Sequence, residues 1–168
     1  NGNGKKDEVP LAGAYISGWN AMIDGFLMMP FIYNDLDQRH FLENGQVVQA
    51  YTRPEWRDGL KFMADLYEEG LILPDTFTQD MNQLIALGEN PNNVILGSVT
   101  GGHQGVFLQL NSGSGRESDY KTIPPFEGPM GRYARLIPVY GTNISYITNI
   151  NENPEASFRL LDFMYTPQ

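Results

Sequence analysis

Apolar residues recur along the chain in short blocks, and their spacing switches between that of strands and that of helices. Compact apolar runs bounded by polar or glycine-rich stretches are typical of buried strands, and apolar residues every three or four positions are typical of helices. The pattern predicts strands at 9–16, 92–99, 133–139 and 143–149, a hairpin at 41–48, and helices at 18–29, 52–69, 78–87, 104–110 and from 154 onward. Strands and helices that alternate in this way indicate an α/β fold.

Two neighbouring segments carry the clearest local signals. Asn44-Gly45 lies between apolar residues, and this pair favours a two-residue hairpin turn because both residues accept left-handed backbone conformations. Thr52 and Glu55 have the spacing of a capping box, in which each side chain bonds the backbone N–H of the other residue. We therefore expect Thr52 to begin a long helix and Gly70 to end it.

Composition narrows the classes of function. The chain has 168 residues, a hydrophobic fraction of 41% and a formal net charge of −9. These values indicate one folded domain over 1–168 and argue against binding to nucleic acid or to anionic lipid. The sequence has no cysteine, so it excludes disulfides, thiol catalysis and thiolate metal sites. No apolar run reaches the roughly 18–20 residues that span a bilayer.

The first eight residues, Asn1-Gly2-Asn3-Gly4-Lys5-Lys6-Asp7-Glu8, have the composition of a cation-binding loop. Oxygen-bearing side chains stand at alternate positions, and the glycines allow a tight turn that can aim several oxygens at Ca²⁺. The usual signature starts with an Asp two positions before its first Asn. That Asp would precede this sequence, which suggests a piece of a larger protein. The alternative is a solvated terminal tail.

Carboxylates offer another class of function, catalysis at a glycosidic bond. Asp35 and Asp37 lie close together in a polar stretch. Such chemistry needs two carboxyl groups roughly 5–10 Å apart across the sugar, a distance that a sequence does not establish. Glu68 and Glu69 are adjacent on a predicted helix and point in different directions, so their spacing does not form a catalytic pair.

Binding groups are expected where predicted strands end. Ligands of open α/β sheets gather at the carboxyl ends of the strands, which favours Ser98, His103 and Gln104. A surface or helix-capping role for His103 is an equal alternative. A sugar has an apolar face and a polar edge, so aromatic rings beside hydrogen-bonding groups suit it. Trp19 and Tyr140 lie near predicted element ends and complete the candidate set.

Several blocks, taken in order, resemble the extracellular solute-binding proteins of bacterial ABC importers. The likeness is greatest to the sugar-binding lipoproteins that include LipO-like and alginate-oligosaccharide-binding proteins. The blocks are NGNGKKDEVPL at 1–11, RDGLKFMADLYEEGLI at 57–72, FTQD at 77–80, PPFEGPMG at 124–131 and PEASFRLLDFM at 154–164. The resemblance implies most of the second lobe of a type II periplasmic-binding-protein-like fold, with a mixed sheet flanked by helices.

In that family two lobes close on a solute, and the protein captures the solute without catalysing a reaction. The resemblance therefore implies a lipid-anchored receptor on the surface of a Gram-positive bacterium, which captures a carbohydrate (an oligosaccharide above all) and delivers it to an ABC permease. It also implies a structural Ca²⁺ site. The ligands by position are Asn1, Asn3, the carbonyl of Lys5, Asp7 and Glu8. The alternatives are a fragment of a carbohydrate-active enzyme that uses the loop carboxylates, and a calcium-stabilised adhesion module.

Overall fold

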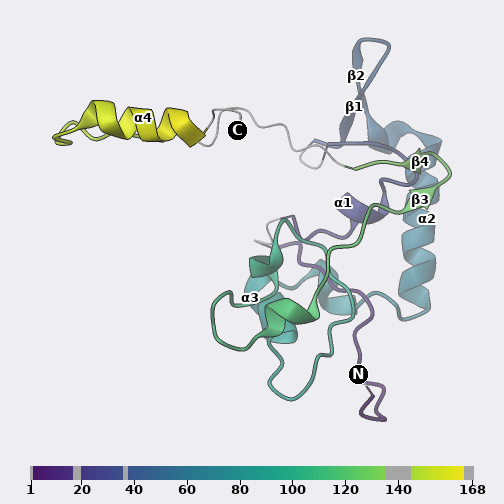
Figure 1. Ribbon diagram of the computed structural model, residues 1–168. Helices are drawn as coiled ribbons and strands as arrows, with labels where there is room; N and C mark the ends of the chain where they lie inside the picture. Colours follow the sequence, from purple (N-terminus) through teal and green to yellow (C-terminus); the bar gives the residue numbers. More distant parts are fainter. Residues whose placement is uncertain (1, 17–19, 36–37, 135–144, 165–168) are drawn as a thin grey trace. The chain divides into compact units, whose positions relative to one another are not determined.

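The computed structural model describes residues 2–16, 20–35, 38–134 and 145–164 (Figure 1). The chain forms two compact units, Asn1–Leu136 and Ile137–Gln168. Helices and strands are both present, as the sequence predicts, while the assignment of one domain to 1–168 stays a prediction. None of the helices in these described ranges is long and apolar enough to cross a lipid bilayer.

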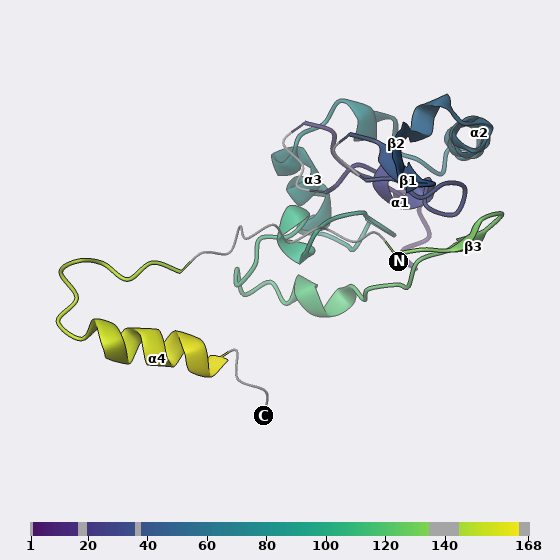
Figure 2. The same cartoon turned by 90° about the horizontal axis from the view of Figure 1, so that it is seen from above.

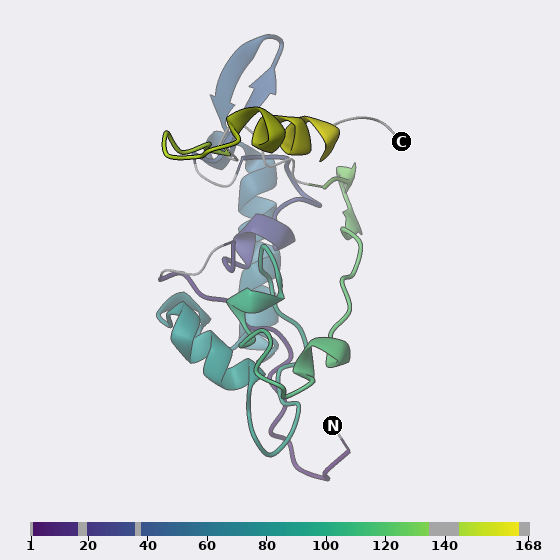
Figure 3. The same ribbon diagram turned by 60° about the vertical axis from the view of Figure 1, so that its left-hand side comes forward.

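Short regular elements and longer connections make up the first unit (Figure 1). Its helices are α1 (Asp24–Leu27), α2 (Pro54–Glu68) and α3 (Met81–Gly88), with 3-10 helices η1 (Ala50–Thr52), η2 (Pro74–Phe77), η3 (Gln104–Val106) and η4 (Arg116–Asp119). Its strands form two antiparallel hairpins, β1 (His40–Glu43) with β2 (Gln46–Gln49) and β3 (Glu127–Gly128) with β4 (Gly131–Arg132). The second unit contains α4 (Pro154–Met164), the helix predicted from 154 onward (Figure 3).

Three extended segments run parallel to one another in the first unit. Single bridges join Val9 to Leu96, Leu11 to Ile72, Ala12 to Val99 and Ile16 to Asp80. The stretches 9–16 and 92–99 therefore pair with each other, but they are not the continuous strands that their sequence predicts. Pro10 accounts for part of the difference because it has no N–H to donate to a neighbouring strand. Its carbonyl accepts a bond from the hydroxyl of Ser98.

The stretch 9–16, which pairs with both of the other extended segments, is the central segment. Apolar side chains cover both of its faces. Ala12 and Ala14 belong to a core that includes Leu84 of α3, whereas Leu11 and Tyr15 pack on a second core that α1 and α2 help to build. Successive side chains of an extended segment point to opposite faces, so alternate residues enter different cores. Figure 2 shows α3 and α2 on different sides of this unit. The central segment is therefore covered by helices on both faces.

The hairpin predicted over 41–48 is confirmed. Strands β1 and β2 pair with Glu43 opposite Gln46, and the two turn residues between them have φ values of 51° at Asn44 and 78° at Gly45. These left-handed values are those that a two-residue turn with Asn-Gly requires. The cross-strand pair of Leu42 and Val47 is exposed on one face of the hairpin.

The prediction that Thr52 caps the start of α2 is wrong. The N-cap of α2 is Arg53, whose side chain makes no capping bond, and the hydroxyl of Thr52 donates instead to the carbonyl of Gln49. Proline at the first helical position needs no N–H partner there and already has a helical φ, which favours Pro54 as the start. The predicted end is confirmed, since Gly70 follows the helix with a φ of 73°.

Other predicted helices are shorter than the apolar pattern suggests. Positions 18–19 of the helix predicted over 18–29 lie outside the described residues, and 20–29 contain α-helix only at α1. The helix predicted over 104–110 is reduced to the single turn of η3. Helix α3 begins after Asp80, whose side chain forms a capping box with Gln83. The strands predicted at 133–139 and 143–149 fall partly outside the described residues, and positions 133–134 and 145–149 contain no strand.

Candidate functional site

Three connections leave the parallel segments at the same end and form what we call the edge loops. The first edge loop is 13–21, the second is 73–80 and the third is 100–105; residues 17–19 lie outside the described residues. The carboxyl ends of parallel strands are where α/β proteins place their ligand-binding groups. The edge loops are therefore the candidate site that the topology selects.

At Gly13 the central segment pairs with buried side chains instead of a neighbouring backbone, between the bridges at Ala12 and Ile16. The N–H of Gly13 donates to the hydroxyl of Thr76 at 3.3 Å, and the amide of Gln79 donates to the carbonyl of Gly13 at 2.6 Å. Both side chains are buried. A buried backbone group needs such a partner, since leaving it unpaired costs about 1–3 kcal/mol. The second edge loop thus supplies the partners of both backbone groups of Gly13.

A third buried side chain joins the first and third edge loops. The hydroxyl of Thr100 donates to the carbonyl of Ala21 at 2.8 Å, and the same carbonyl accepts the N–H of Ala14 at 3.0 Å. Glycine is required beside this contact, because a Cβ on Gly13 would lie 2.3 Å from the oxygen of Ala21. The geometry fixes both ends of the first edge loop.

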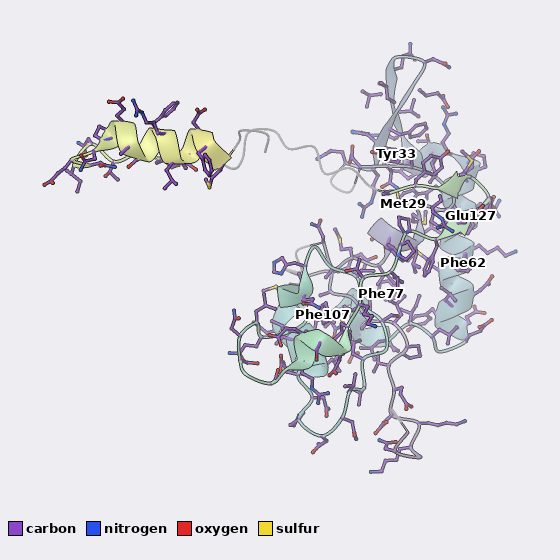
Figure 4. The ribbon with its side chains drawn as sticks, viewed as in Figure 1. Met29, Tyr33, Phe62, Phe77, Phe107 and Glu127 are labelled. Atoms are coloured by element: carbon purple, nitrogen blue, oxygen red, sulfur yellow. The ribbon has the colours of Figure 1, made fainter. Side chains whose placement is uncertain are left out.

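A buried carboxylate lies beside the first edge loop. Asp24 accepts one bond from the hydroxyl of Tyr15 at 2.8 Å and one from the guanidinium of Arg39 at 2.5 Å. Burial of the ring and the nearby charge of Asp24 both raise the pKa of Tyr15 above its usual value. The ring of Phe77, labelled in Figure 4, packs against Tyr15 with the centroids 5.5 Å apart. The carboxylate of Asp24 thus bonds two polar groups, and the ring of Phe77 covers Tyr15.

The candidate ligand residues that the structure describes make bonds within the chain. The Nδ1 atom of exposed His103 accepts the N–H of Gly105 at 2.9 Å, as a helix-capping residue does. The amide of Gln104 donates to the carbonyl of Glu117 at 3.0 Å, and the hydroxyl of Ser98 donates to Pro10. His103 and Gln104 lie in the third edge loop and Ser98 lies just before it. Trp19 and Tyr140 lie outside the described residues.

Of the two carboxylates considered for catalysis, the structure describes Asp35 but not Asp37. The carboxylate of Asp35 accepts the N–H of Gln38 at 2.6 Å and that of His40 at 3.3 Å, and it lies 4.0 Å from the Nδ1 atom of His40. Asp35 thus closes the loop that leads into β1.

The loop predicted to bind calcium is exposed and held by its own side chains. The Oδ1 atom of Asn3 accepts the N–H of Lys5 at 2.8 Å, and its amide nitrogen donates to Asp7 at 2.9 Å. Gly2 and Gly4 have left-handed φ values, as a tight loop requires. Within the described ranges, no group of three His, Asp or Glu side chains is placed to hold a metal ion. An ion at this loop would therefore need amide and carbonyl oxygens as well. Asn1 is outside the described residues.

Sequence reasoning missed the polar residues that organise the edge loops. Thr76, Gln79 and Thr100 bond backbone atoms that lie 63, 66 and 79 positions away along the chain. No local pattern marks such residues. Thr100 carries one usable signal, because it directly follows the strand predicted at 92–99. Thr76 and Gln79 follow no predicted strand and carry no such signal.

Comparisons with known proteins identify relatives of this chain. No family model matches the sequence. The fructooligosaccharide ABC transporter substrate-binding protein FusA of Streptococcus pneumoniae serotype 4 is 30% identical over 173 aligned positions, which cover 99% of this chain and 30% of that protein. The structure of the S. pneumoniae protein FusA in complex with kestose matches with a TM-score of 0.64 and 28% identity, over 99% of this chain and 33% of the other.

These two matches extend over nearly all of this sequence, but the chain spans about a third of the length of the relatives. The alignment covers 99% of the chain and is accompanied by a similar three-dimensional arrangement. The resemblance that the sequence blocks indicate is thereby confirmed at the level of the family. The chain is homologous to a segment of the substrate-binding proteins of ABC transporters.

Proposed function

We propose that this chain is part of an extracellular solute-binding protein that delivers a carbohydrate to an ABC importer. The observation that carries the proposal is the likeness over 99% of the chain to a fructooligosaccharide-binding relative, whose solved structure contains kestose. The sequence match and the structural match are both to FusA, which is described as a substrate-binding protein. The same likeness favours capture of a sugar over the alternative of glycosidic-bond hydrolysis.

The sugar would meet this chain at the edge loops. Support for this location comes from the parallel segments that end there and from the rule that ligands of α/β sheets bind at such ends. Among the described candidates His103 is the one with an exposed side chain, and an imidazole can exchange hydrogen bonds with sugar hydroxyls. Ser98, Gln104, Trp19 and Tyr140 complete the proposed set.

The finer features of the proposal follow the family resemblance. The chain would form most of one lobe of a type II periplasmic-binding-protein-like fold, and two lobes would hinge shut on the solute. The complete protein would be lipid-anchored on the surface of a Gram-positive bacterium and would dock on its permease when closed. A lobe alone supplies one side of the cleft, so the sugar affinity of the isolated chain would be far below that of the complete protein.

A structural Ca²⁺ ion would stabilise the N-terminal loop. The chemistry of the donors fits this ion, because Ca²⁺ prefers carboxylate, amide and carbonyl oxygens. The bond between the Asn3 amide and Asp7 keeps the carboxylate close to the Asn3 side chain. Asn1, the carbonyl of Lys5 and Glu8 would supply further oxygens. The ion would pin the loop and take no part in sugar binding.

Isothermal titration calorimetry of the complete protein tests the proposal. The panel contains kestose, longer fructooligosaccharides, maltotriose and an alginate oligosaccharide, with each sugar analysed chromatographically after the titration. We expect saturable binding of one sugar class and no change in the sugar. Cleavage that is lost on Asp35→Asn would contradict the proposal and support the enzyme. A protein that binds none of these sugars would contradict the carbohydrate assignment.

A further inference from the structure

One backbone oxygen links two of the edge loops. The carbonyl of Ala21 accepts the N–H of Ala14 at 3.0 Å and the hydroxyl of Thr100 at 2.8 Å. A carbonyl has two lone pairs, so it accepts both bonds at once. Ala14 and Ala21 are fully buried, and Thr100 is 9% exposed. The contact therefore lies in the interior of the first unit.

Ala14, Ala21 and Thr100 lie at or next to the ends of the first and third edge loops. Ala14 and Ala21 stand at the two ends of the first edge loop, and their bond closes it. Thr100 is the first residue of the third edge loop, directly before Gly101-Gly102 and His103. Both glycines are exposed. Thr100 is thus the fixed point from which the exposed part of the third edge loop begins.

The other buried polar side chains at this edge act differently. Thr76 and Gln79 bond the backbone of Gly13. Gly13 directly precedes Ala14, whose bond to Ala21 closes the first edge loop. Thr76 belongs to η2 and Gln79 follows it, so this pair ties the second edge loop to the first. Among the described hydrogen bonds of these three side chains, only that of Thr100 connects the first edge loop to the third.

We propose that Thr100 is a positioning residue of the sugar site, which holds the first and third edge loops at a fixed separation through the carbonyl of Ala21. The inference rests on the proposed function, because it assigns the purpose of the contact to ligand binding. Groups held in place before the ligand arrives lose less conformational freedom on binding. Loss of the Thr100 hydroxyl changes none of the side chains that would bind the sugar. It removes the contact that fixes the spacing between the two loops.

Hydrogen exchange of the complete protein, followed by mass spectrometry, tests the contact without any ligand. Thr100→Val keeps the shape and removes the donor, Thr100→Ser keeps the donor, and Thr76→Val is the matched change of a buried threonine. We expect Thr100→Val to exchange about two- to tenfold faster in peptides that contain Ala14 and in peptides that contain 101–105, which corresponds to one net hydrogen bond. Thr100→Ser should match the wild type. Thr76→Val should leave 101–105 unchanged, and faster exchange there in both valine variants would overturn the inference.

Sugar affinity of the same variants tests the purpose. We expect Thr100→Val to bind about two- to tenfold more weakly than the wild type, with the affinity restored in Thr100→Ser. An unchanged affinity in Thr100→Val, together with faster exchange in both loops, would overturn the positioning role. A wild type that binds no sugar would contradict the proposed function, while the exchange comparison would still decide whether Thr100 joins the loops.

Discussion

The guanidinium of Arg39 lies 2.5 Å from the carboxylate of Asp24, and their side chains are only 19% and 11% exposed. This ion pair connects the residue before β1 to the first residue of α1. Arg39 has a φ of 57°, a left-handed conformation that costs energy in a residue other than glycine. Its carbonyl accepts the N–H of Ala50 at 2.7 Å. The pair therefore holds a strained residue at the base of the β1–β2 hairpin.

Removal of the charge of Asp24 should destabilise the protein strongly. Asp24→Asn removes the buried carboxylate charge that pairs with the guanidinium of Arg39, and breaking such a pair costs about 3–5 kcal/mol when it is fully buried. We expect a loss of about 2–4 kcal/mol in the free energy of unfolding, measured by urea denaturation, because the pair retains some exposure.

The matched control is an exposed ion pair in α4. Glu155→Gln removes the negative charge that pairs with Arg159, and both of these side chains are more than three-quarters exposed. Surface pairs of this kind contribute about 0–1 kcal/mol. Equal losses from Asp24→Asn and Glu155→Gln would show that Asp24 is not a structural anchor.

Tyr15 should make the stability fall at high pH. Burial and the charge of Asp24 raise the pKa of Tyr15, so folding favours the neutral phenol. Its stabilising contribution is complete below the unfolded pKa of about 10 and is lost as the pH rises above that value, by up to about 1.4 kcal/mol per pH unit. Urea denaturation at pH 9, 10 and 11 should show a shallower fall for Tyr15→Phe than for the wild type. Parallel curves for the two proteins would contradict this assignment.

Elements with a local signal were predictable from the sequence. The β1–β2 hairpin follows from Asn44-Gly45, and the end of α2 follows from Gly70. The start of α2 was misassigned, because the side chain of Thr52 bonds Gln49 and not the helix. The capping box of α3 uses Asp80 and Gln83, a signature that is visible in the sequence but was not read.

Elements that depend on distant contacts were not predictable. The stretch 9–16 looks like a regular strand, but Pro10 interrupts the ladder, and side chains from 76 and 79 take over at Gly13. Asp24 reads as one polar residue in a helical pattern, and nothing nearby indicates that Arg39 pairs with it. The location of the candidate site follows from strand ends, whereas the residues that shape it come from three separate segments.

A methyl group on Gly13 should be far more damaging than one on Gly59. The Cβ of Gly13→Ala would lie 2.3 Å from the carbonyl oxygen of Ala21, whereas that of Gly59→Ala would meet the sulfur of Met28 at 2.5 Å. A methionine side chain can move aside, and alanine is about 1 kcal/mol better than glycine within a helix. The oxygen of Ala21 is held by two hydrogen bonds.

We therefore expect Gly13→Ala to lower the free energy of unfolding by about 3 kcal/mol or more. Gly59→Ala should change it by less than about 1 kcal/mol. Urea denaturation of both variants measures the difference. Similar values for the two would mean that the backbone at Ala21 can relax, and the close approach of the two segments would then not be a constraint.

His103 should contribute to sugar affinity if the proposed function holds. Its side chain is exposed in the third edge loop, and loss of one hydrogen bond to a sugar hydroxyl would weaken binding about tenfold. Calorimetry of His103→Ala in the complete protein measures the change. The control is His40→Gln, because His40 begins β1 and lies outside the edge loops. Full affinity in His103→Ala would remove this residue from the proposed site.

Calcium should stabilise the complete protein through its N-terminal loop, as the family resemblance implies. A ligand that binds the folded state alone adds stability by mass action, about 2.7 kcal/mol at one hundred times its dissociation constant, which raises the melting temperature by several degrees. The carboxylate of Asp7, held by Asn3, would be one of the ligands. We expect Ca²⁺ to raise the melting temperature over that in EGTA, and Asp7→Asn to abolish most of the rise. Asp58→Asn, in the exposed part of α2, should keep it, so a rise that survives Asp7→Asn would place the ion elsewhere.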